Sequence, residues 1–355
     1  MDKTALITGI TGQDGSYLAR FLLEKGYIVH GMQLYCATPD TERLTAFTAH
    51  DNFHLHYGDL TDGGAIHRLL GHIRPDEIYN LGAQSHVKVS FDVPEATADI
   101  NALGTLRLLE AMRTLGLHES GTRFYQASSS EMFGHSPAPQ NEQTPFQPLS
   151  PYATAKLAAY WYVRNYRESY GFHASNGILF NHESPLRGDA FVTQKIVKAV
   201  QAIKAGTQDM LRIGNLEARR DWGHARDYVE GMWLMLQQGA PDDYVLATGK
   251  SYSVRDFVNT SFMLSGIALE WEGEGLGEIA RDPKSGRILV AVDPQYFRPN
   301  ELHELVGDAT KANEKLGWAP CISFTELVRG MLDEAANNKD RDGENGYEGF
   351  IKSKG

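Results

Sequence analysis

Residues 4–25, TALITGITGQDGSYLARFLLEK, join a short apolar run to a helix-forming segment through a loop that contains three glycines. The apolar run at 4–8 predicts a buried strand, and residues 16–25 predict an amphipathic helix. The turn between them is formed around Gly9, Gly12 and Gly15. A strand, a glycine-rich turn and a helix in this order are typical of a dinucleotide-binding unit.

The glycine loop predicts a site for a pyrophosphate. Without Cβ atoms the backbone can approach the phosphates closely, and the helix N-terminus adds partial positive charge. The residues expected to line this cofactor pocket lie in the loop and after the third and fourth strands: Gly9, Gly12, Gln13, Asp14, Gly15, Asp59, Leu60, Leu81 and Ala83. Asp59 fits either of two roles, an acceptor for the adenine amino group or a loop-capping carboxylate.

Strand and helix patterns alternate along the first half of the chain. Further strands are predicted at 28–32, 53–57, 77–80, 123–127 and 173–180, and further helices at 63–73, 95–115 and 151–170. This alternation predicts an α/β protein with a Rossmann-type, doubly wound parallel sheet. Right-handed crossovers then bring the carboxyl ends of the strands to one edge, where ligands bind.

The pattern loosens after residue 180. We predict loops at 181–188, 219–224 and 273–287, with helices at 193–205 and 254–264. The expected organisation is an NAD(P)-binding domain at 1–180, a smaller C-terminal region at 181–336 that mainly binds the substrate, and a mobile polar tail at 337–355.

The composition excludes several classes of protein. Hydrophobic residues make up 42% of the 355 residues and the net charge is −11, so neither nucleic acid nor an anionic membrane is expected as a partner. Two cysteines form neither a disulfide framework nor a metal cluster. Apolar runs stay well below the roughly 18–20 residues of a membrane helix, and the start lacks a secretory pattern. We therefore expect a soluble cytoplasmic protein.

A candidate catalytic pair lies in SPYATAK, residues 150–156. Tyr152 and Lys156 are four residues apart, which places both side chains on one face of the predicted helix. A lysine ammonium favours the phenolate form of a nearby tyrosine, which can then take a proton from a sugar hydroxyl. This spacing of tyrosine and lysine alone is common on solvated helices, but the segment SPYATAK at the start of a helix after the fifth strand is far less common.

A serine-rich turn with one carboxylate follows the fifth strand, at 128–134 (SSSEMFG). A hydroxyl here can bond the substrate oxygen that becomes a carbonyl. Glu131 is the informative residue, because a carboxylate beside the tyrosine–lysine pair can remove a proton α to a new ketone. The alternative is an exposed or salt-bridged loop glutamate.

Together these segments resemble the extended short-chain dehydrogenase/reductase superfamily, and more specifically the GDP-mannose 4,6-dehydratases. The resemblance runs from Thr4 to about Pro320. Its landmarks are ITGQDGSYLA, HYGDL, YNLGAQSHV, FYQASSSEMFG, SPYATAK, GILFNHESP, RDWGHARDYV, YFRPNE and EKLGW.

The resemblance implies roles for individual residues. The catalytic group comprises Ser129 (usually threonine in the family), Glu131, Tyr152 and Lys156. The cofactor would also contact His182, Arg187 and the Tyr152–Lys156 pair. Substrate binding is implied for Ser85, Ser130, Asn181, Lys195, Arg220, Arg298 and Glu301, and Glu183 lies in the same segment as Asn181. The cations would hold the diphosphate, the alternative being surface ion pairs.

No metal is expected, because no spacing of His, Cys and Asp suggests a ligand set. His86, His182 and His224 are therefore also interpreted as structural residues.

One departure concerns the loop after the second strand. The family usually has two arginines where this chain has Leu34 and Tyr35. Those arginines are expected near the 2′-phosphate of NADP and help to assemble a tetramer. The resemblance still favours NADP over NAD, with Arg43 or a neighbouring subunit as a possible source of charge. A homodimer or homotetramer is expected, built on the helices at 95–115 and 151–170.

The implied reaction is an internal redox dehydration of GDP-mannose, in which hydride moves from C4 to C6 and water is lost. Tyr152 would take the O4 proton and Glu131 the H5 proton. Three alternatives remain: the same dehydration of GDP-manno-heptose or a GDP-hexosamine, a nucleotide-sugar 4-reductase or 4-epimerase, and a non-catalytic dinucleotide sensor. Glu131 argues against the reductase or epimerase, and retention of all four catalytic residues argues against the sensor.

Overall fold

The computed structural model describes residues 2–36, 42–296 and 304–337, and it divides the chain into two compact units. The first unit comprises residues 1–183, 218–252 and 298–323, and the second comprises 184–217, 253–297 and 324–355. The division therefore differs from the predicted single boundary at residue 180. Two later segments return to the first unit because they add a strand to the edge of its sheet and helices to one face.

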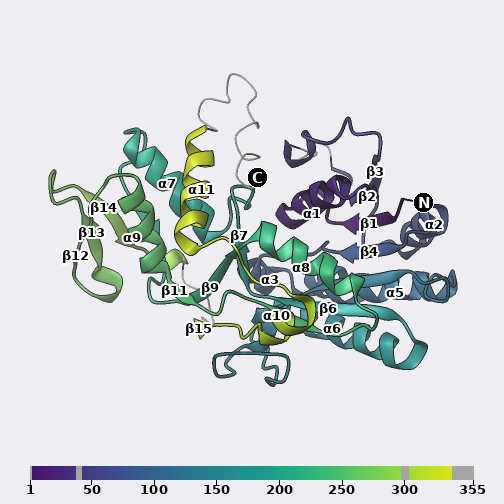
Figure 1. Ribbon diagram of the computed structural model, residues 1–355. Helices are drawn as coiled ribbons and strands as arrows, with labels where there is room; N and C mark the ends of the chain where they lie inside the picture. The colour runs from purple at the N-terminus through teal and green to yellow at the C-terminus, as the bar shows by residue number, and fades with distance from the viewer. Residues whose placement is uncertain (1, 37–41, 297–303, 338–355) are drawn as a thin grey trace. The chain divides into compact units, whose positions relative to one another are not determined.

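The first unit contains a seven-stranded sheet in the order β10-β6-β5-β4-β1-β2-β3, and every strand pair in it is parallel (Figure 1). This confirms the predicted doubly wound α/β fold, and the predicted strand bounds agree within two residues. The strands are β1 (Thr4–Thr8), β2 (Ile28–Gln33), β3 (Phe53–Tyr57), β4 (Glu77–Asn80), β5 (Arg123–Ser129), β6 (His173–Leu179) and β10 (Tyr244–Leu246).

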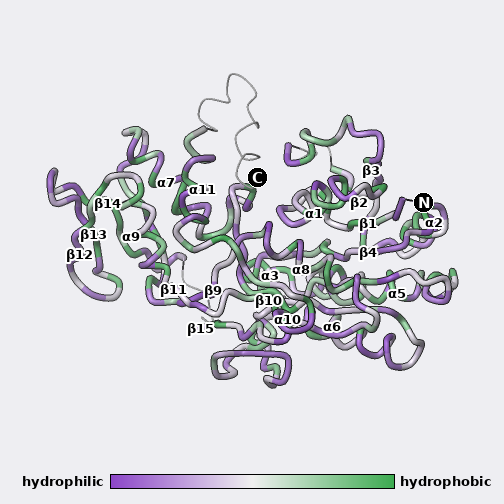
Figure 2. The backbone as a smooth tube through the Cα atoms, in the orientation of Figure 1, coloured by the Kyte–Doolittle hydropathy of each residue, from purple (hydrophilic) through white to green (hydrophobic). Residues whose placement is uncertain are grey.

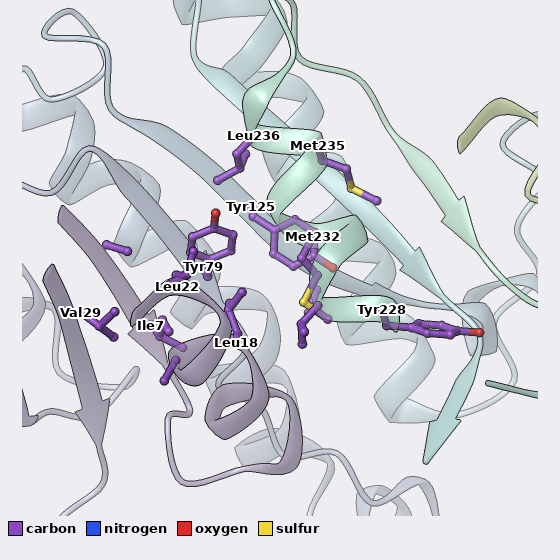
Figure 3. Packing of buried hydrophobic residues seen from close by; sticks show 14 of the residues in the cluster. Ile7, Leu18, Leu22, Val29, Tyr79, Tyr125, Tyr228, Met232, Met235 and Leu236 are labelled. Atoms are coloured by element: carbon purple, nitrogen blue, oxygen red, sulfur yellow. The ribbon is translucent and has the colours of Figure 1, made fainter. Parts of the chain in front are cut away.

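Helices cover both faces of this sheet, which explains why its central strands β1, β4 and β5 are buried along nearly their whole length. One face packs against α1 (Gln13–Glu24), α8 (Ala225–Gln237) and α10 (Thr310–Leu316). The other packs against α2 (Gly63–Ile73), α5 (Gly104–Thr114) and α6 (Pro151–Tyr170). Figure 3 shows side chains of the first cluster, where Ile7 of β1 and Leu18 of α1 lie near Met232 of α8. The helices packed on both faces hold the strands in place, and the carboxyl ends of these strands position the site.

The helix predicted at 95–115 is interrupted. It begins as α4 (Pro94–Ala98), continues through a π-helical stretch at Asp99–Leu103, and resumes as α5. A short helix, α3 (Val87–Asp92), precedes it. Pro94 is the first residue of α4, a position that suits proline because the amide there needs no hydrogen-bond acceptor within the helix.

A small sheet in the first unit corrects two loop predictions. Residues 181–188 begin with β7 (Asn181–Glu183), and residues 219–224 form β9 (Arg219–His224), which pairs with β7 in parallel. The sheet also includes β11 (Ser251–Ser253) and β15 (Glu304–Leu305). The polar composition of β9 hid it in the sequence. Its Asp221 is fully buried and accepts hydrogen bonds from Thr248, Gly249 and Gly307.

The second unit combines three helices with a four-stranded sheet in the order β12-β13-β14-β8. The helices α7 (Val192–Lys204), α9 (Val254–Leu264) and α11 (Phe324–Asn337) pack on one another. The strands are β8 (Leu211–Ile213), β12 (Glu270–Glu272), β13 (Ile279–Arg281) and β14 (Ile288–Val292), so the predicted loop at 273–287 is wrong in part. Figure 2 shows hydrophilic residues at the turns between β12, β13 and β14.

Three predictions fall on residues outside the described ranges: Arg298, Glu301 and the tail after residue 337. Within the described ranges, no helix has the length and apolar character needed to cross a membrane.

Candidate functional site

The glycine loop is held by close contacts between backbones. Gly9 has a positive φ of 68°, and a Cβ there would lie 2.8 Å from the Cα of Gly82 in the loop after β4. A Cβ on Gly15 would lie 2.4 Å from the Gly9 carbonyl oxygen. Both positions therefore require glycine so that two loops and the start of α1 can meet.

Gly12 differs from these two glycines. Apart from its own chain and helix neighbours, the one described heavy atom within 4 Å of a Cβ added here is the Gly9 carbonyl oxygen, at 3.2 Å. Gly12 is also the N-cap of α1, without a side-chain cap, and the helix begins at Gln13 rather than at residue 16. This uncapped helix start with an open glycine face fits a pyrophosphate.

Asp14 and His182 form a pair beside the loop. The Nε2 of His182 lies 2.7 Å from Oδ2 of Asp14, and its Nδ1 lies 2.7 Å from the Phe180 carbonyl oxygen. A carbonyl only accepts, so Nδ1 is protonated and a further proton lies between His182 and Asp14. The ring also stacks on buried Tyr228, with centroids 4.6 Å apart. The pair fixes the glycine loop to the segment that follows β6.

A buried polar network joins the carboxyl ends of three neighbouring strands. Thr8 donates to Asn80 at 2.7 Å, and Asn80 donates to Gln126 at 2.8 Å and to Thr105 at 3.1 Å. Thr8 also accepts from the Gly82 amide at 2.9 Å. Buried polar groups that satisfy one another hold this edge of the sheet in one arrangement.

The other residues predicted near the cofactor lie around the same edge. One carboxylate oxygen of Asp59 accepts from the Thr61 amide at 2.8 Å, which is the loop-capping role. Leu60 is buried, whereas Leu81 and Ala83 are half-buried in the loop after β4. Ser85 is exposed in that loop.

Tyr152 and Lys156 occupy the first two turns of α6, which Ser150 caps by accepting from the Ala153 amide. Both side chains are buried, at 9% and 4% exposed. The Lys156 ammonium donates to the Ala127 carbonyl of β5 at 2.8 Å and lies 5.9 Å from the Tyr152 ring centroid. Burial lowers the pKa of Lys156 to about 8, while the carboxylate of Asp14 acts in the opposite direction.

Ser129, Ser130 and Glu131 stand where β5 ends. The Ser129 hydroxyl accepts from the Glu131 amide at 3.2 Å and so caps the short turn at Ser130–Phe133. Ser130 is 2% exposed, and Glu131 is half-buried. The same strand thus carries the carbonyl that holds Lys156 and the turn that carries Glu131.

Three further predicted substrate residues lie on the small sheet of the first unit. Asn181 and Glu183 belong to β7 and pair in register with Trp222 and His224 of β9. Arg220 of β9 is 6% exposed and donates to the Arg219 carbonyl at 2.8 Å. Arg220 is therefore not an exposed surface cation.

Two predicted cations belong to the second unit. Arg187 lies over the Phe191 ring, 3.5 Å from its centroid. Lys195 of α7 points its ammonium at the Tyr296 ring, 3.0 Å from the centroid. The Nζ atom of Lys195 is buried and has no hydrogen-bond partner among the described residues. A buried ammonium in that state is suited to an anionic ligand.

Sequence reasoning missed Thr8, Thr105, Gln126 and Tyr296. Neutral polar residues on separate elements leave no local pattern, because their meeting depends on strand order. Tyr296 had a signal, since it opens the YFRPNE landmark. Groups of His, Cys, Asp and Glu that could hold a metal are absent from the described residues.

Comparison with known proteins identifies the family. The family model described as GDP-mannose 4,6 dehydratase matches residues 6–331. The chain belongs to the GDP-mannose 4,6 dehydratase family. It is 57% identical over 338 residues to the GDP-mannose 4,6-dehydratase of Sinorhizobium fredii (strain HH103), a match that spans 94% of this chain and 96% of that one. The human GDP-mannose 4,6 dehydratase is 54% identical over 337 residues, spanning 93% and 90% of the two chains.

Among solved structures, the UDP-glucose 4-epimerase of Thermus thermophilus in complex with NAD resembles this GDP-mannose 4,6 dehydratase family member with a TM-score of 0.77. The two are 25% identical, and the likeness covers 94% of this chain and 98% of the epimerase. The predicted family and fold are therefore confirmed.

Proposed function

We propose that the chain is a hydro-lyase that converts GDP-mannose into GDP-4-keto-6-deoxymannose and water. Relatives named for this activity are more than 50% identical over nearly the whole chain. The structural observation that supports the proposal most is that β5 positions both the redox pair and the carboxylate needed for dehydration. Its Ala127 carbonyl holds the Lys156 ammonium of the redox pair, and its carboxyl end carries Glu131.

The residues at the glycine loop fit a nicotinamide dinucleotide. The open face of Gly12 and the uncapped start of α1 suit its pyrophosphate, as described above. When bound, this cofactor accepts a hydride from the sugar and later returns it. Gly9, Gly15 and Gly82 would keep the loop in shape, and the Asp14–His182 pair would fix its orientation.

The chain's own residues would move two protons. Tyr152 takes the proton from O4 of the hexose, and the Lys156 ammonium stabilises the phenolate. The resulting 4-ketone acidifies the hydrogen on C5, which Glu131 removes. Glu131, helped by the Ser130 hydroxyl, then delivers this proton to O6, so that the oxygen leaves as water. When C6 receives the hydride, Tyr152 gives the proton it took from O4 to C5, and both residues return to their starting states. The Ser129 hydroxyl bonds O4.

The cations would recognise the diphosphate of the GDP-sugar. The net charge of −11 provides no general attraction for a dianion, so local groups must supply it. Lys195 is best suited, because its buried ammonium lacks a hydrogen-bond partner among the described residues. Arg220 would contribute a second charge, and Arg187 would serve the cofactor. Arg298 completes the proposed set of cations, and Glu301 is proposed to contact another part of the GDP-sugar.

For the cofactor we propose NADP rather than NAD. The end of β2 carries no acidic residue that would repel a 2′-phosphate, since Gln33, Leu34 and Tyr35 stand there. The two exposed free thiols, Cys36 and Cys321, suit a reducing compartment, and we place the protein in the cytoplasm.

We further propose a homodimer through the face formed by α4 and α6. An apolar groove of about 490 Å³ runs between these helices and is lined mainly by proline, alanine and leucine. Trp161 on α6 and Leu103 near α4 expose 51% and 41% of their surface. A second copy, presenting the same helices, would cover this surface. Ala158→Arg, inside the groove, should yield a monomer by light scattering, whereas Lys204→Glu should leave the dimer intact.

The function is tested by incubating the purified protein with GDP-mannose, GDP-manno-heptose, a GDP-hexosamine, UDP-glucose and dTDP-glucose, and weighing the products. Loss of one water from GDP-mannose, with no added oxidant consumed, is the expected result. An epimerase leaves the mass unchanged, and a reductase consumes reduced cofactor. Either outcome, or a preference for another sugar, would contradict the proposal.

A further inference from the structure

The strand β2 ends at Gln33, and Leu34 and Tyr35 follow it. Gln33 is 4% exposed, and its Oε1 atom has no hydrogen-bond partner among the described residues. Leu34 and Tyr35, which follow it, are 61% and 74% exposed. In this fold the residue at the end of the second strand meets the ribose 2′ position. Gln33 can bond a ribose oxygen there, but none of the three residues offers positive charge.

A cation from another segment of the chain contacts the glycine loop. Arg43 lies on a short helical turn at Glu42–Leu44, and Leu44 anchors this turn in the core of the first unit. The Arg43 guanidinium donates to the carbonyl of Thr11, in the glycine loop, at 3.3 Å. It therefore stands beside the loop that begins the cofactor site, although it follows that loop by about thirty residues.

We infer that Arg43 is the residue that binds the 2′-phosphate of NADP in this chain. This inference rests on the proposed dehydratase function and deepens it. A guanidinium has a planar set of donors, so Arg43 can keep its bond to Thr11 and direct other N–H groups at phosphate oxygens. Gln33 completes the site as a neutral partner for the ribose that does not repel the phosphate.

The experiment measures dinucleotide binding on the full-length protein after bound nucleotide has been removed. Dissociation constants for NADP, NAD, adenosine 2′,5′-bisphosphate and AMP are determined by calorimetry for the wild type, Arg43→Gln, Arg43→Lys and Arg20→Gln. We expect the wild type to bind NADP more tightly than NAD by about 10- to 100-fold, which corresponds to about 1.4–2.8 kcal/mol. In Arg43→Gln the two affinities should become about equal, while the dissociation constant for NAD stays within about threefold of the wild-type value.

The controls separate charge near the site from charge in general. Arg20 is a half-buried cation on α1 that pairs with Glu24, so Arg20→Gln should keep the full preference. Arg43→Lys should keep part of it, because the charge remains but the planar donor set is lost. An unchanged NADP/NAD ratio in Arg43→Gln would overturn the inference, and so would a wild type without preference. If Arg43→Gln does not fold, equal wild-type affinity for the bisphosphate and AMP would overturn it instead.

Product formation from GDP-mannose is measured separately with each dinucleotide. A wild type that forms product but shows no role for Arg43 contradicts only this inference. A wild type that forms no product contradicts the proposed function.

Discussion

The carboxyl edge of the sheet in the first unit differs from the Lys195 region of the second unit in how far its buried polar groups are hydrogen-bonded within the protein. At the sheet edge, Thr8, Asn80 and Gln126 satisfy one another, and the Lys156 ammonium already has the Ala127 carbonyl as acceptor. In the second unit, the buried Lys195 ammonium lies over the Tyr296 ring and has no hydrogen-bond partner among the described residues. One region is complete without a ligand, and the other is not.

The difference fits the two tasks that we propose. Catalytic groups must keep their geometry throughout the reaction, so internal hydrogen bonds hold them in place. A residue that binds an anionic substrate gains most when its charge is not already neutralised by the protein. The predictions below test each side of this contrast.

The largest effect is expected at the sheet edge from Glu131→Gln. The amide keeps the size of the side chain but cannot accept the C5 proton, so turnover should fall about 10²–10⁴-fold. Loss of water from GDP-mannose, followed by mass spectrometry, checks this. Glu119→Gln, on a side chain that is 80% exposed, is the control and should be fully active. Near-normal turnover in Glu131→Gln would remove Glu131 from the mechanism.

In the second unit, Lys195→Ala should raise KM for GDP-mannose by about 10- to 100-fold and change kcat less, because a charge-assisted hydrogen bond contributes about 1.5–3 kcal/mol. Steady-state kinetics measure both constants. The matched control is Lys198→Ala on the same helix, since Lys198 is half-exposed and pairs with Asp189. If both variants raise KM equally, general surface charge rather than the Lys195 ammonium attracts the substrate.

Substitutions of Gly12 and Gly15 in the glycine loop should have different effects on stability and on cofactor binding. Gly15→Ala places a methyl group against the Gly9 carbonyl and should destabilise the fold by about 1–3 kcal/mol. Gly12→Ala brings its Cβ within 3.2 Å of one backbone atom, the Gly9 carbonyl oxygen, so it should destabilise the fold less than Gly15→Ala, by about 0.5–1 kcal/mol, while dinucleotide affinity drops about tenfold. Urea unfolding and calorimetry measure the two quantities. Equal destabilisation by both variants would contradict the open face assigned to Gly12.

Lys156→Met should abolish activity, yet we expect it to raise the stability of the fold slightly. The folded-state pKa of Lys156 is about 8, below the usual 10.5, so the folded protein holds this proton less tightly than the unfolded chain. The resulting destabilisation, at most about 3 kcal/mol, is complete below pH 8 and disappears as the pH rises towards 10.5. Since the Ala127 carbonyl also loses its donor, the net gain at pH 7 should be about 1–2 kcal/mol.

Urea unfolding at pH 7 and at pH 10 checks this, and the gain should shrink at the higher pH. Lys204→Met, at an exposed position on α7, should show no such dependence. A gain that stays constant with pH would mean that burial of the charge is not its cause.

Local sequence determined much of this protein. The alternation of strands and helices predicted the sheet, because short strand patterns separated by helical periods are typical of a parallel sheet that helices cover on both faces. The glycine spacing marked the cofactor loop, and the Tyr152–Lys156 spacing placed both side chains on one helix face, since such features depend on residues close together in the chain.

Only the tertiary structure decided the rest. The strand β9 and the return of α8 and β10 to the first unit were not predicted, because a polar strand is stabilised by distant partners such as those of Asp221. The spacing of residues in the sequence likewise does not predict that Arg43 contacts Thr11. It also does not predict that the Lys195 ammonium lacks a hydrogen-bond partner among the described residues. Periodicity records which side of an element is buried, whereas a partner across the fold is fixed only when the elements pack.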